Sequence, residues 1–203
     1  WRLVGRGPLL RWFHRDALCH VDAAPPPQGA ACTVALTIDD APCRLGNEAS
    51  MVPEVLALLK EHDALATFMV MGKFVEGNED DLVQLLREGH ELGNHGLVDK
   101  SYHRDSVEAF ASAVDECSSK ILALQRAAGV QEGVQWFRAP HAKYNQSMTL
   151  TLKERGLTNV MCDTYACCPV IQDGHFVGSF LAEHAEHGSI ILLHMPEHGF
   201  REW

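Results

Sequence analysis

Two kinds of apolar pattern alternate along the chain from residue 32 onward. Short runs of β-branched and other apolar residues predict buried strands, and longer segments with apolar residues at helical spacing predict amphipathic helices. The strands are expected over residues 32–38, 66–72, 90–95, 134–140, 158–164 and 189–195, and the helices over residues 52–62, 79–89, 104–129, 147–156 and 176–188. Such alternation predicts an α/β fold with a parallel sheet, either a barrel or a doubly wound layer.

Residues 1–31 lack this alternation and end in the Pro-rich stretch AAPPPQGAA. We therefore predict an irregular N-terminal lead-in over 1–31 and one folded domain over 32–203. A chain of 203 residues is long enough for one domain with a substantial core.

The charge and composition of the chain limit the classes of partner that it is expected to bind. The formal net charge of −10 argues against nucleic acid or an anionic membrane surface, because both require clustered Lys and Arg. No apolar run is long enough to span a membrane, no secretory leader is readable, and the compartment stays open. The seven Cys form no C-x-x-C motif and cannot all pair internally, so we expect most to be reduced thiols.

Polar clusters follow the predicted strands at the point where each strand ends. DD follows VALTI, NH follows ELG, RAPH follows VQWF, DTY follows NVMC, and HMP follows IILL. In a (β/α) barrel these strand ends converge on one face, where active sites are built. The sequence therefore predicts an active site assembled from five separate loops.

Asp39 and Asp40 are adjacent carboxylates after a buried strand, and they repel each other unless a cation or a donor compensates. An isolated pair of this kind is most often a strand-ending turn. The alternative is a division of labour, in which one carboxylate binds a metal ion and the other acts as a base. Neighbouring side chains of a strand point to opposite sides, so this requires a bend in the backbone.

His95 and Asp99 have a spacing at which two side chains share one face of a helical turn. As a lone pair they are more often structural than ligating. With Asp40 they would form an N/O site that accepts zinc, and also manganese, iron or cobalt, and leaves positions open for water and substrate.

Arg138 and His194 each end a predicted strand. An Arg at such a place can cap a loop, or it can orient a carboxylate and keep it ionised. A His after four apolar residues is more often a core residue, but at the mouth of a barrel it can donate a proton to a leaving amine.

The motifs TIDDAP, NHGLVD, FRAP, CDTY and ILLHM, in this order, resemble those of the NodB-homology polysaccharide deacetylases, the fourth carbohydrate esterase family. The resemblance spans residues 33–195. It implies a distorted (β/α) barrel and the metal-dependent removal of acetyl groups from N-acetylated amino-sugar polymers or oligosaccharides, such as chitin or peptidoglycan. The cofactor it implies is one divalent metal ion, with zinc as first choice.

The resemblance also implies roles by position. Asp39 matches the general base, Arg138 the residue that tunes it, and His194 the general acid. The metal-binding positions are Asp40, His95 and Asp99, and the substrate-binding positions are Pro140, His141, Asp163, Tyr165 and Leu192.

Several departures from the family pattern bear on function. Asp99 replaces a second His, His141 replaces a Tyr, and no Trp follows Asp163, where Tyr165 is the available substitute. The helix and strand that normally close the barrel are not found in the 203 residues. Two alternatives therefore stay open. One is a hydrolase of another acyl target, such as an O-acetyl sugar or a small amide, and the other is a carbohydrate-binding protein with a decayed site.

Overall fold

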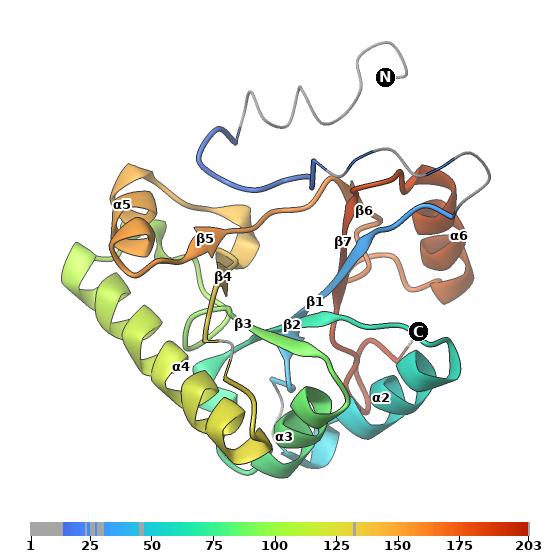
Figure 1. The fold of residues 1–203 in the computed structure, drawn as a ribbon, viewed down its shortest axis with the longest axis horizontal. Coiled ribbons are helices and arrows are strands. Elements are labelled where there is room, and N and C mark those ends of the chain that lie inside the picture. The colour runs from blue at the N-terminus through green and yellow to red at the C-terminus, as the bar shows by residue number, and fades with distance from the viewer. Residues whose placement is uncertain are drawn as a thin grey trace.

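A curled parallel sheet forms the centre of the molecule (Figure 1). The computed structural model describes residues 14–22, 24, 27, 31–44, 47–131 and 133–202. Within these residues the sheet has seven strands in the order β5-β4-β3-β2-β1-β7-β6, and neighbouring strands pair in parallel. The strands are β1 (Ala35–Ala41), β2 (Thr67–Val70), β3 (Glu91–Asn94), β4 (Trp136–Phe137), β5 (Thr158–Asn159), β6 (Thr164–Tyr165) and β7 (Ile190–His194).

The connection between β5 and β6 explains the curl. These strands are the two edges of the sheet, yet only residues 160–163 separate them. In a flat sheet of this size the edges would lie roughly 29 Å apart, at about 4.8 Å per strand interval. The peptide steps from Asn159 to Thr164 span at most about 18 Å. The edges must therefore approach each other, which confirms the predicted distorted (β/α) barrel.

The predicted strand over residues 158–164 is wrong in one respect, because the structure has two short strands there. Residues 160–163 leave one edge of the sheet and cross to the other. Their backbone is bound on the way, since Met161 N donates to Leu18 O at 2.7 Å and Asp163 N donates to Ile190 O at 3.2 Å. The apolar run NVMC is thus a buried crossing segment, which periodicity alone does not distinguish from a strand.

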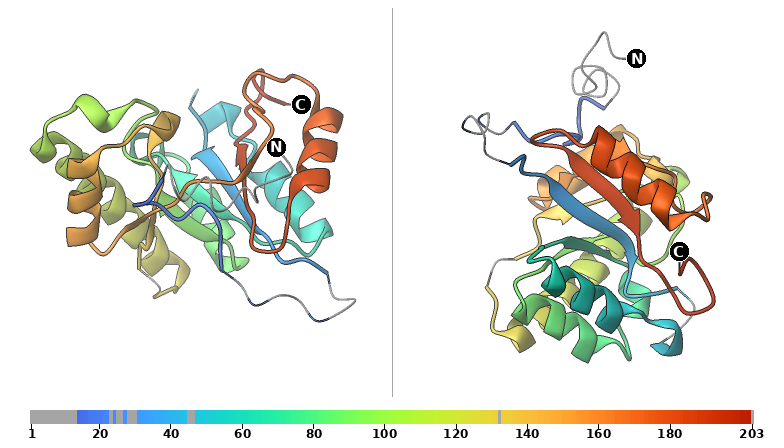
Figure 2. Two further views of the ribbon diagram at one scale, coloured as in Figure 1. Left: turned by 90° about the horizontal axis from the view of Figure 1, so that it is seen from above. Right: turned by 90° about the vertical axis from the view of Figure 1, so that its right-hand side faces the viewer.

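Helices lie between the strands, as the pattern predicts. They are α2 (Val52–Glu61), α3 (Glu79–Arg87), α4 (Val107–Ala128), α5 (Gln146–Glu154) and α6 (Gly174–His184), with short 3₁₀ turns at Asn47–Ala49, Gly72–Phe74, Tyr102–Arg104 and Pro140–Ala142. Figure 2 shows β1 and β7 side by side, with α6 close to β7. In the described part of the chain, no helix is both long and apolar enough to cross a membrane.

The largest core cluster lies between the sheet and helices α2, α3 and α4. Phe68 and Val70 of β2 are completely buried there, as are Leu82 and Leu85 of α3 and Ile121 of α4. Burying a side chain of this size contributes roughly 1.5–3 kcal/mol. This packing fixes β1, β2 and β3, the strands whose ends carry the acidic pair and His95.

Part of the N-terminal segment lies across the link between the two edge strands. Leu18 forms an isolated bridge with Val160, and His20 forms one with Ser189. The described residues before 32 contain no helix or strand, only turns and isolated bridges. Residues 1–13 and most of the Pro-rich stretch lie outside the described residues.

Candidate active site

One cavity opens at the carboxyl ends of the strands, where the sequence predicts the site. Its volume is about 490 Å³. Nine of the predicted site residues line it, namely Asp39, Asp40, His95, Asp99, Arg138, His141, Tyr165, Leu192 and His194. Pro140 and Asp163, both within the described residues, are not among the lining side chains.

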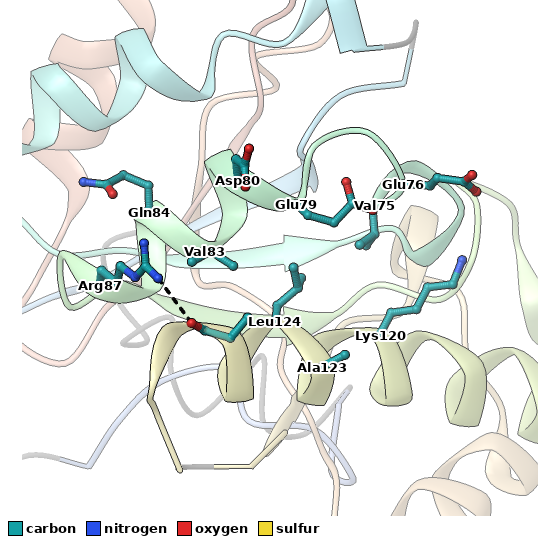
Figure 3. Close-up of a pocket in the computed structure, with 11 residues that line it drawn as sticks. Val75, Glu76, Glu79, Asp80, Val83, Gln84, Arg87, Lys120, Ala123 and Leu124 are labelled. Carbon is teal, nitrogen blue, oxygen red and sulfur yellow. Dashed lines mark hydrogen bonds between the residues drawn. The ribbon is translucent and has the colours of Figure 1, made fainter.

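A larger cavity of about 760 Å³ lies between α3 and α4 (Figure 3). Its two cationic side chains already have partners, since Arg87 donates to Ala127 O at 3.3 Å and Lys120 donates to Gly72 O at 2.9 Å. No His or Cys is among the described residues that line it. The cavity at the strand ends is therefore the better candidate for chemistry.

A bulge in β1 brings both carboxylates into this cavity. The register with β2 shifts between Ile38 and Ala41, and Asp40 has a left-handed φ of 65°. An irregularity of this kind re-aims side chains that would otherwise alternate across the strand. Asp39 and Asp40 are 4% and 2% exposed, and each has an oxygen close to His95 Nε2, at 3.8 and 3.7 Å. The bend required for a division of labour is present.

Arg138 is buried and holds Asp39. Its Nη1 donates to Asp39 Oδ1 and to Thr37 Oγ1, both at 2.7 Å. Its Nε and Nη2 donate to the backbone oxygens of Val160 and Met161, both at 3.0 Å. The guanidinium is thus clamped between β1 and the crossing segment, which fixes its position relative to Asp39.

The charge state of Asp39 follows from this contact. Burial alone raises the pKa of the carboxyl, but the positive charge of Arg138, the largest of the effects that lower it, and the hydrogen bond from Arg138 help to hold the pKa below its usual value. Asp39 is therefore ionised at neutral pH, as a general base must be.

The orientation of His95 suits a metal ligand. Its Nδ1 lies 2.9 Å from the carbonyl oxygen of Arg138, which can only accept a hydrogen bond, so Nδ1 carries the hydrogen. The lone pair of Nε2 then points toward Asp40 Oδ1, 3.7 Å away. Ligands bonded to one ion at about 2.0–2.2 Å are separated by roughly this distance, so Asp40 and His95 fit a divalent cation.

Asp99 contacts Arg44 and His141 and does not share a helical face with His95. Residues 95–99 form an irregular bend rather than a helical turn, because Gly96 has a φ of +77° and Tyr102 Oη accepts hydrogen bonds from the backbone of residues 97 and 98. The shared helical face expected for His95 and Asp99 is therefore wrong. Asp99 Oδ2 lies 3.2 Å from Arg44 Nη1, and Oδ1 lies 3.2 Å from His141 Nε2.

Among the described residues, no three His, Cys, Asp or Glu side chains are arranged to hold a metal ion. Asp99 lines the same cavity as Asp40 and His95, so its role as third ligand stays a prediction.

Two arginines in the cavity were missed by the sequence reasoning. Arg201 Nη1 donates to Asp40 Oδ2 at 2.7 Å, and Arg44 Nε lies 3.6 Å from the same oxygen. Arg44 also contacts the buried Glu197 at 3.3 Å. The position of Arg44, four residues after Asp40, was the available signal. Arg201 lies in an irregular C-terminal turn, and no periodicity indicates its contact with Asp40.

His194 and Leu192 come from the end of β7. The ring of His194 lies 5.9 Å from that of Tyr165, and its Nδ1 lies 3.2 Å from Cys168 Sγ. Burial lowers the pKa of His194 more than the nearby carboxylates Asp39 and Asp40 raise it. The ring is therefore mainly neutral near pH 7.

Asp163 is bound within the wall rather than facing the cavity. Its Oδ2 lies 2.7 Å from His20 Nδ1 and accepts from Ser189 Oγ at 3.2 Å, and Oδ1 accepts from Ile190 N at 2.9 Å. These contacts tie the crossing segment to β7 and to the N-terminal segment. The structure thus gives Asp163 partners of an architectural kind, and its predicted role in substrate binding stays untested.

The loop after β4 brings His141 to the rim of the cavity. His141 has a left-handed φ of 57°, and the following Ala142 one of 56°. A non-glycine backbone of this kind is costly and is concentrated at functional sites. The side chain of His141 is 48% exposed.

The chain belongs to a known family of hydrolases. The sequence profile of the family described as polysaccharide deacetylase matches residues 28–160. The resemblance predicted from the five motifs is thereby confirmed.

Two curated relatives illustrate the match. A peptidoglycan-N-acetylglucosamine deacetylase of Bacillus cereus is 29% identical over 172 residues, which cover 79% of this chain and 71% of that protein. A chitooligosaccharide deacetylase of Azorhizobium caulinodans is 29% identical over 170 residues, which cover 80% of this chain and 73% of that protein.

Solved structures share the fold. A family 4 acetyl xylan esterase from Clostridium thermocellum, in complex with a cobalt ion, superposes with a TM-score of 0.68 at 24% identity, covering 79% of this chain and 73% of that one. A family 4 pseudoenzyme from Bacillus anthracis superposes with a TM-score of 0.70 at 22% identity. That match covers 85% of this chain but only 59% of the pseudoenzyme chain, so this chain spans less than two thirds of it.

Proposed function

We propose that this protein is a metal-dependent hydrolase that removes acetyl groups from N-acetylated amino sugars in chitin-like or peptidoglycan-like polymers or oligosaccharides. One observation carries the proposal. A buried, ionised Asp39 is held by Arg138 beside Asp40 and His95, whose Oδ1 and Nε2 atoms lie 3.7 Å apart. A protein that only binds sugar needs neither an ionised base nor a site for a cation next to it.

Asp40 Oδ1 and His95 Nε2 are the atoms that would hold one divalent cation, with Asp99 as the proposed third ligand. Zinc is the first choice for such an N/O set, and manganese, cobalt and iron are accepted by the same donors. When bound, such an ion supplies Lewis-acid polarisation of the acetyl carbonyl and lowers the pKa of a water molecule.

The remaining steps of the proposed reaction are carried out by side chains and backbone groups of the protein. Asp39, kept ionised by Arg138, removes a proton from the attacking water. The backbone N–H near His141 donates to the oxyanion that forms on the acetyl oxygen. His194 in its protonated, imidazolium form gives a ring proton to the departing amine and becomes neutral. Leu192 lines the cavity where the acetyl methyl group would lie.

The test is acetate release from N-acetylated chito-oligosaccharides by the purified protein, with and without a chelator. The proposal predicts release that stops with chelation and returns when zinc or cobalt is added. Acetylated xylan and a small acetanilide in parallel separate the N-acetyl sugar from other acyl targets. No release from any of these substrates in the presence of added metal would reject the activity.

A second candidate is a carbohydrate-binding protein that has lost catalysis. It draws support from the contacts of Asp40 and Asp99, which are occupied by Arg201, Arg44 and His141. Binding of chito-oligosaccharides, measured by calorimetry, without acetate release would favour this candidate.

A further inference from the structure

Arg201 reaches the acidic pair from the turn that follows β7. Its Nη1 donates to Asp40 Oδ2 at 2.7 Å, while Asp40 Oδ1 faces His95 Nε2 at 3.7 Å. The side chain of Arg201 is only 9% exposed. The two oxygens of Asp40 therefore have different neighbours, since one is bound to a guanidinium group and the other lies beside the imidazole.

We propose that Arg201 is a positioning residue for Asp40, which holds Oδ2 and so leaves Oδ1 as the single oxygen that binds the divalent cation together with His95. This proposal rests on the proposed function, because that function requires the cation.

The turn that carries Arg201 is tied to the rest of the fold. Glu197 N donates to Phe200 O at 2.8 Å, and Phe200 N donates to Glu197 O at 2.7 Å, which closes the turn. His198 N donates to Ala49 O at 2.9 Å, and Glu197 is completely buried. Because the turn is anchored in this way, the backbone sets the direction in which Arg201 leaves it.

The ring of Phe200 supports two of the arginines in the cavity. Its centroid lies 4.8 Å from Arg201 Cζ and 5.0 Å from Arg44 Cζ. A guanidinium group at this distance from an aromatic ring is attracted to its face. The side chain of Arg201 is therefore held by its surroundings as well as by its bond to Asp40.

Arg201 adopts an unfavourable conformation. Its φ of 60° lies in the left-handed region, which residues other than glycine adopt uncommonly. Its Nε is also buried without a hydrogen-bond partner in the described part of the chain. Such costs persist only where the surrounding structure holds a residue in place, and they are concentrated at functional sites. The contact with Asp40 Oδ2 is the interaction that this conformation makes possible.

Two effects of Arg201 on a bound cation oppose each other. Its positive charge repels the cation, but its hydrogen bond fixes the carboxylate that binds it. We expect the second effect to prevail, because the guanidinium group bonds to Oδ2 and not to Oδ1. Hydrogen bonds that orient a ligating carboxylate support metal affinity in this way. Arg201 also compensates the repulsion between Asp40 and the adjacent Asp39, which has its own partner in Arg138.

The experiment uses Arg201→Met, Arg201→Lys and Glu202→Gln in the full chain. Met keeps an apolar side chain but has no donor, whereas Lys keeps a donor and the charge. Glu202→Gln is the matched control, because Glu202 is the next residue and its side chain is 54% exposed. Its Oε1 accepts a hydrogen bond from Gly199 N at 2.6 Å, which the amide oxygen of Gln can also do.

Calorimetric titration with zinc and with cobalt measures the metal affinity of each variant. Arg201→Met should weaken binding about 10–100-fold, the range found when a group that supports a metal ligand is removed. Arg201→Lys should recover part of this loss, since it offers one donor in place of a planar fork. Glu202→Gln should match the wild type.

Two results of the titration would overturn the proposal. If repulsion between the charges decides, Arg201→Met binds the cation more tightly than the wild type. If Arg201 only stabilises the fold, Arg201→Met lowers the Tm of the metal-free protein, but its folded fraction binds zinc and cobalt with unchanged affinity.

Crystals of the wild type grown with cobalt test the geometry without any variant. The proposal predicts cobalt on Oδ1 of Asp40 alone, with Oδ2 still bonded to Arg201. Cobalt on both oxygens of Asp40, or an Arg201 that has turned away from Asp40, would overturn the proposal even if Arg201→Met failed to fold.

The outcomes separate this inference from the proposed activity. If the affinity of Arg201→Met falls as expected but the wild type releases no acetate, the positioning of Asp40 stands and only the activity fails. If the wild type releases acetate and Arg201→Met binds cobalt as tightly as the wild type, the inference fails and the activity stands. A wild type that binds neither zinc nor cobalt would overturn both.

Discussion

The floor and the mouth of the cavity are built differently. The floor, formed by Asp39, Asp40, His95 and Arg138, is buried, and its central ion pair has a separation of 2.7 Å with side chains 1% and 6% exposed. The mouth, formed by Arg44, Asp99 and His141, has one ion pair and one contact to His141, both at 3.2 Å, with side chains 22–48% exposed. A buried pair that loses one partner is strongly destabilised, whereas an exposed pair contributes little.

This difference suggests a division of roles. The floor is rigid because Arg138 makes four hydrogen bonds and His95 is held by a backbone carbonyl. The mouth should exchange partners at a lower cost than the floor, since its side chains are partly exposed. We therefore expect substitutions in the floor to affect chemistry, metal binding and stability together, and substitutions in the mouth to have smaller effects on metal and substrate binding.

The largest effect is expected at Asp39. Asp39→Asn keeps the shape and an acceptor for Arg138 but removes the base, and it should lower the rate of acetate release about 10²–10⁴-fold. Asp115→Asn is the matched control, because the exposed Asp115 pairs with Arg155 at 2.6 Å and neither residue lines the cavity. Activity of Asp39→Asn within a few fold of Asp115→Asn would reject Asp39 as the base.

The next effect concerns stability. Arg138→Met leaves Asp39 buried without its cation and should lower the free energy of unfolding by about 3–5 kcal/mol. Arg155→Met removes a cation from an exposed pair and should cost at most about 1 kcal/mol. Urea denaturation of both variants measures the difference. Equal losses would mean that the floor pair is no more important than a surface pair.

Metal affinity should distinguish the floor from the mouth. Asp40 is already directed at His95, whereas Asp99 must release Arg44 before it can join them. Asp99→Asn should weaken zinc or cobalt binding by at least roughly 10-fold, the lower end of the range for groups that only support a ligand, and Asp40→Asn should weaken it more. Calorimetric titration of the two variants compares them. A greater loss at Asp99 would contradict the assignment of the floor as the primary site.

The smallest effect is a pH dependence outside the site. His90 accepts a hydrogen bond from Ala66 N at 3.2 Å, and burial lowers its pKa. The unfolded chain then binds more protons at this residue than the folded chain. The contribution of His90 to the free energy of unfolding is therefore fully present above a pH of about 6.5, and it is lost as the pH falls below that value. His90→Gln should flatten this part of the curve of Tm against pH, whereas His62→Gln, on an exposed helix end, should not. An unchanged slope in His90→Gln would contradict the role of burial.

The fold was predictable because its signals are local. The five helices were recognisable from apolar spacing, and the predicted end at residue 129 holds, since Gly129 caps α4 with a φ of +81°. The split of 158–164 was not predictable, because a buried crossing segment has the same apolar composition as a strand.

The floor of the site was predictable for a related reason. Asp39 and Asp40 lie near the end of β1, His95 and Arg138 directly follow β3 and β4, and the ends of parallel strands meet. The contacts of Arg201 and Cys168 come from irregular loops, where the chain path depends on tertiary packing. Asp99 could be placed in the cavity, but its partners could not be predicted, because they depend on the left-handed backbone at Gly96.

The most direct test of the account is an anomalous-scattering map of crystals grown with cobalt. The account predicts one strong peak within bonding distance of Asp40 Oδ1 and His95 Nε2, with Asp39 beside it and still paired with Arg138. A peak bound elsewhere, or no peak at these two atoms at a cobalt concentration that supports acetate release, would contradict it.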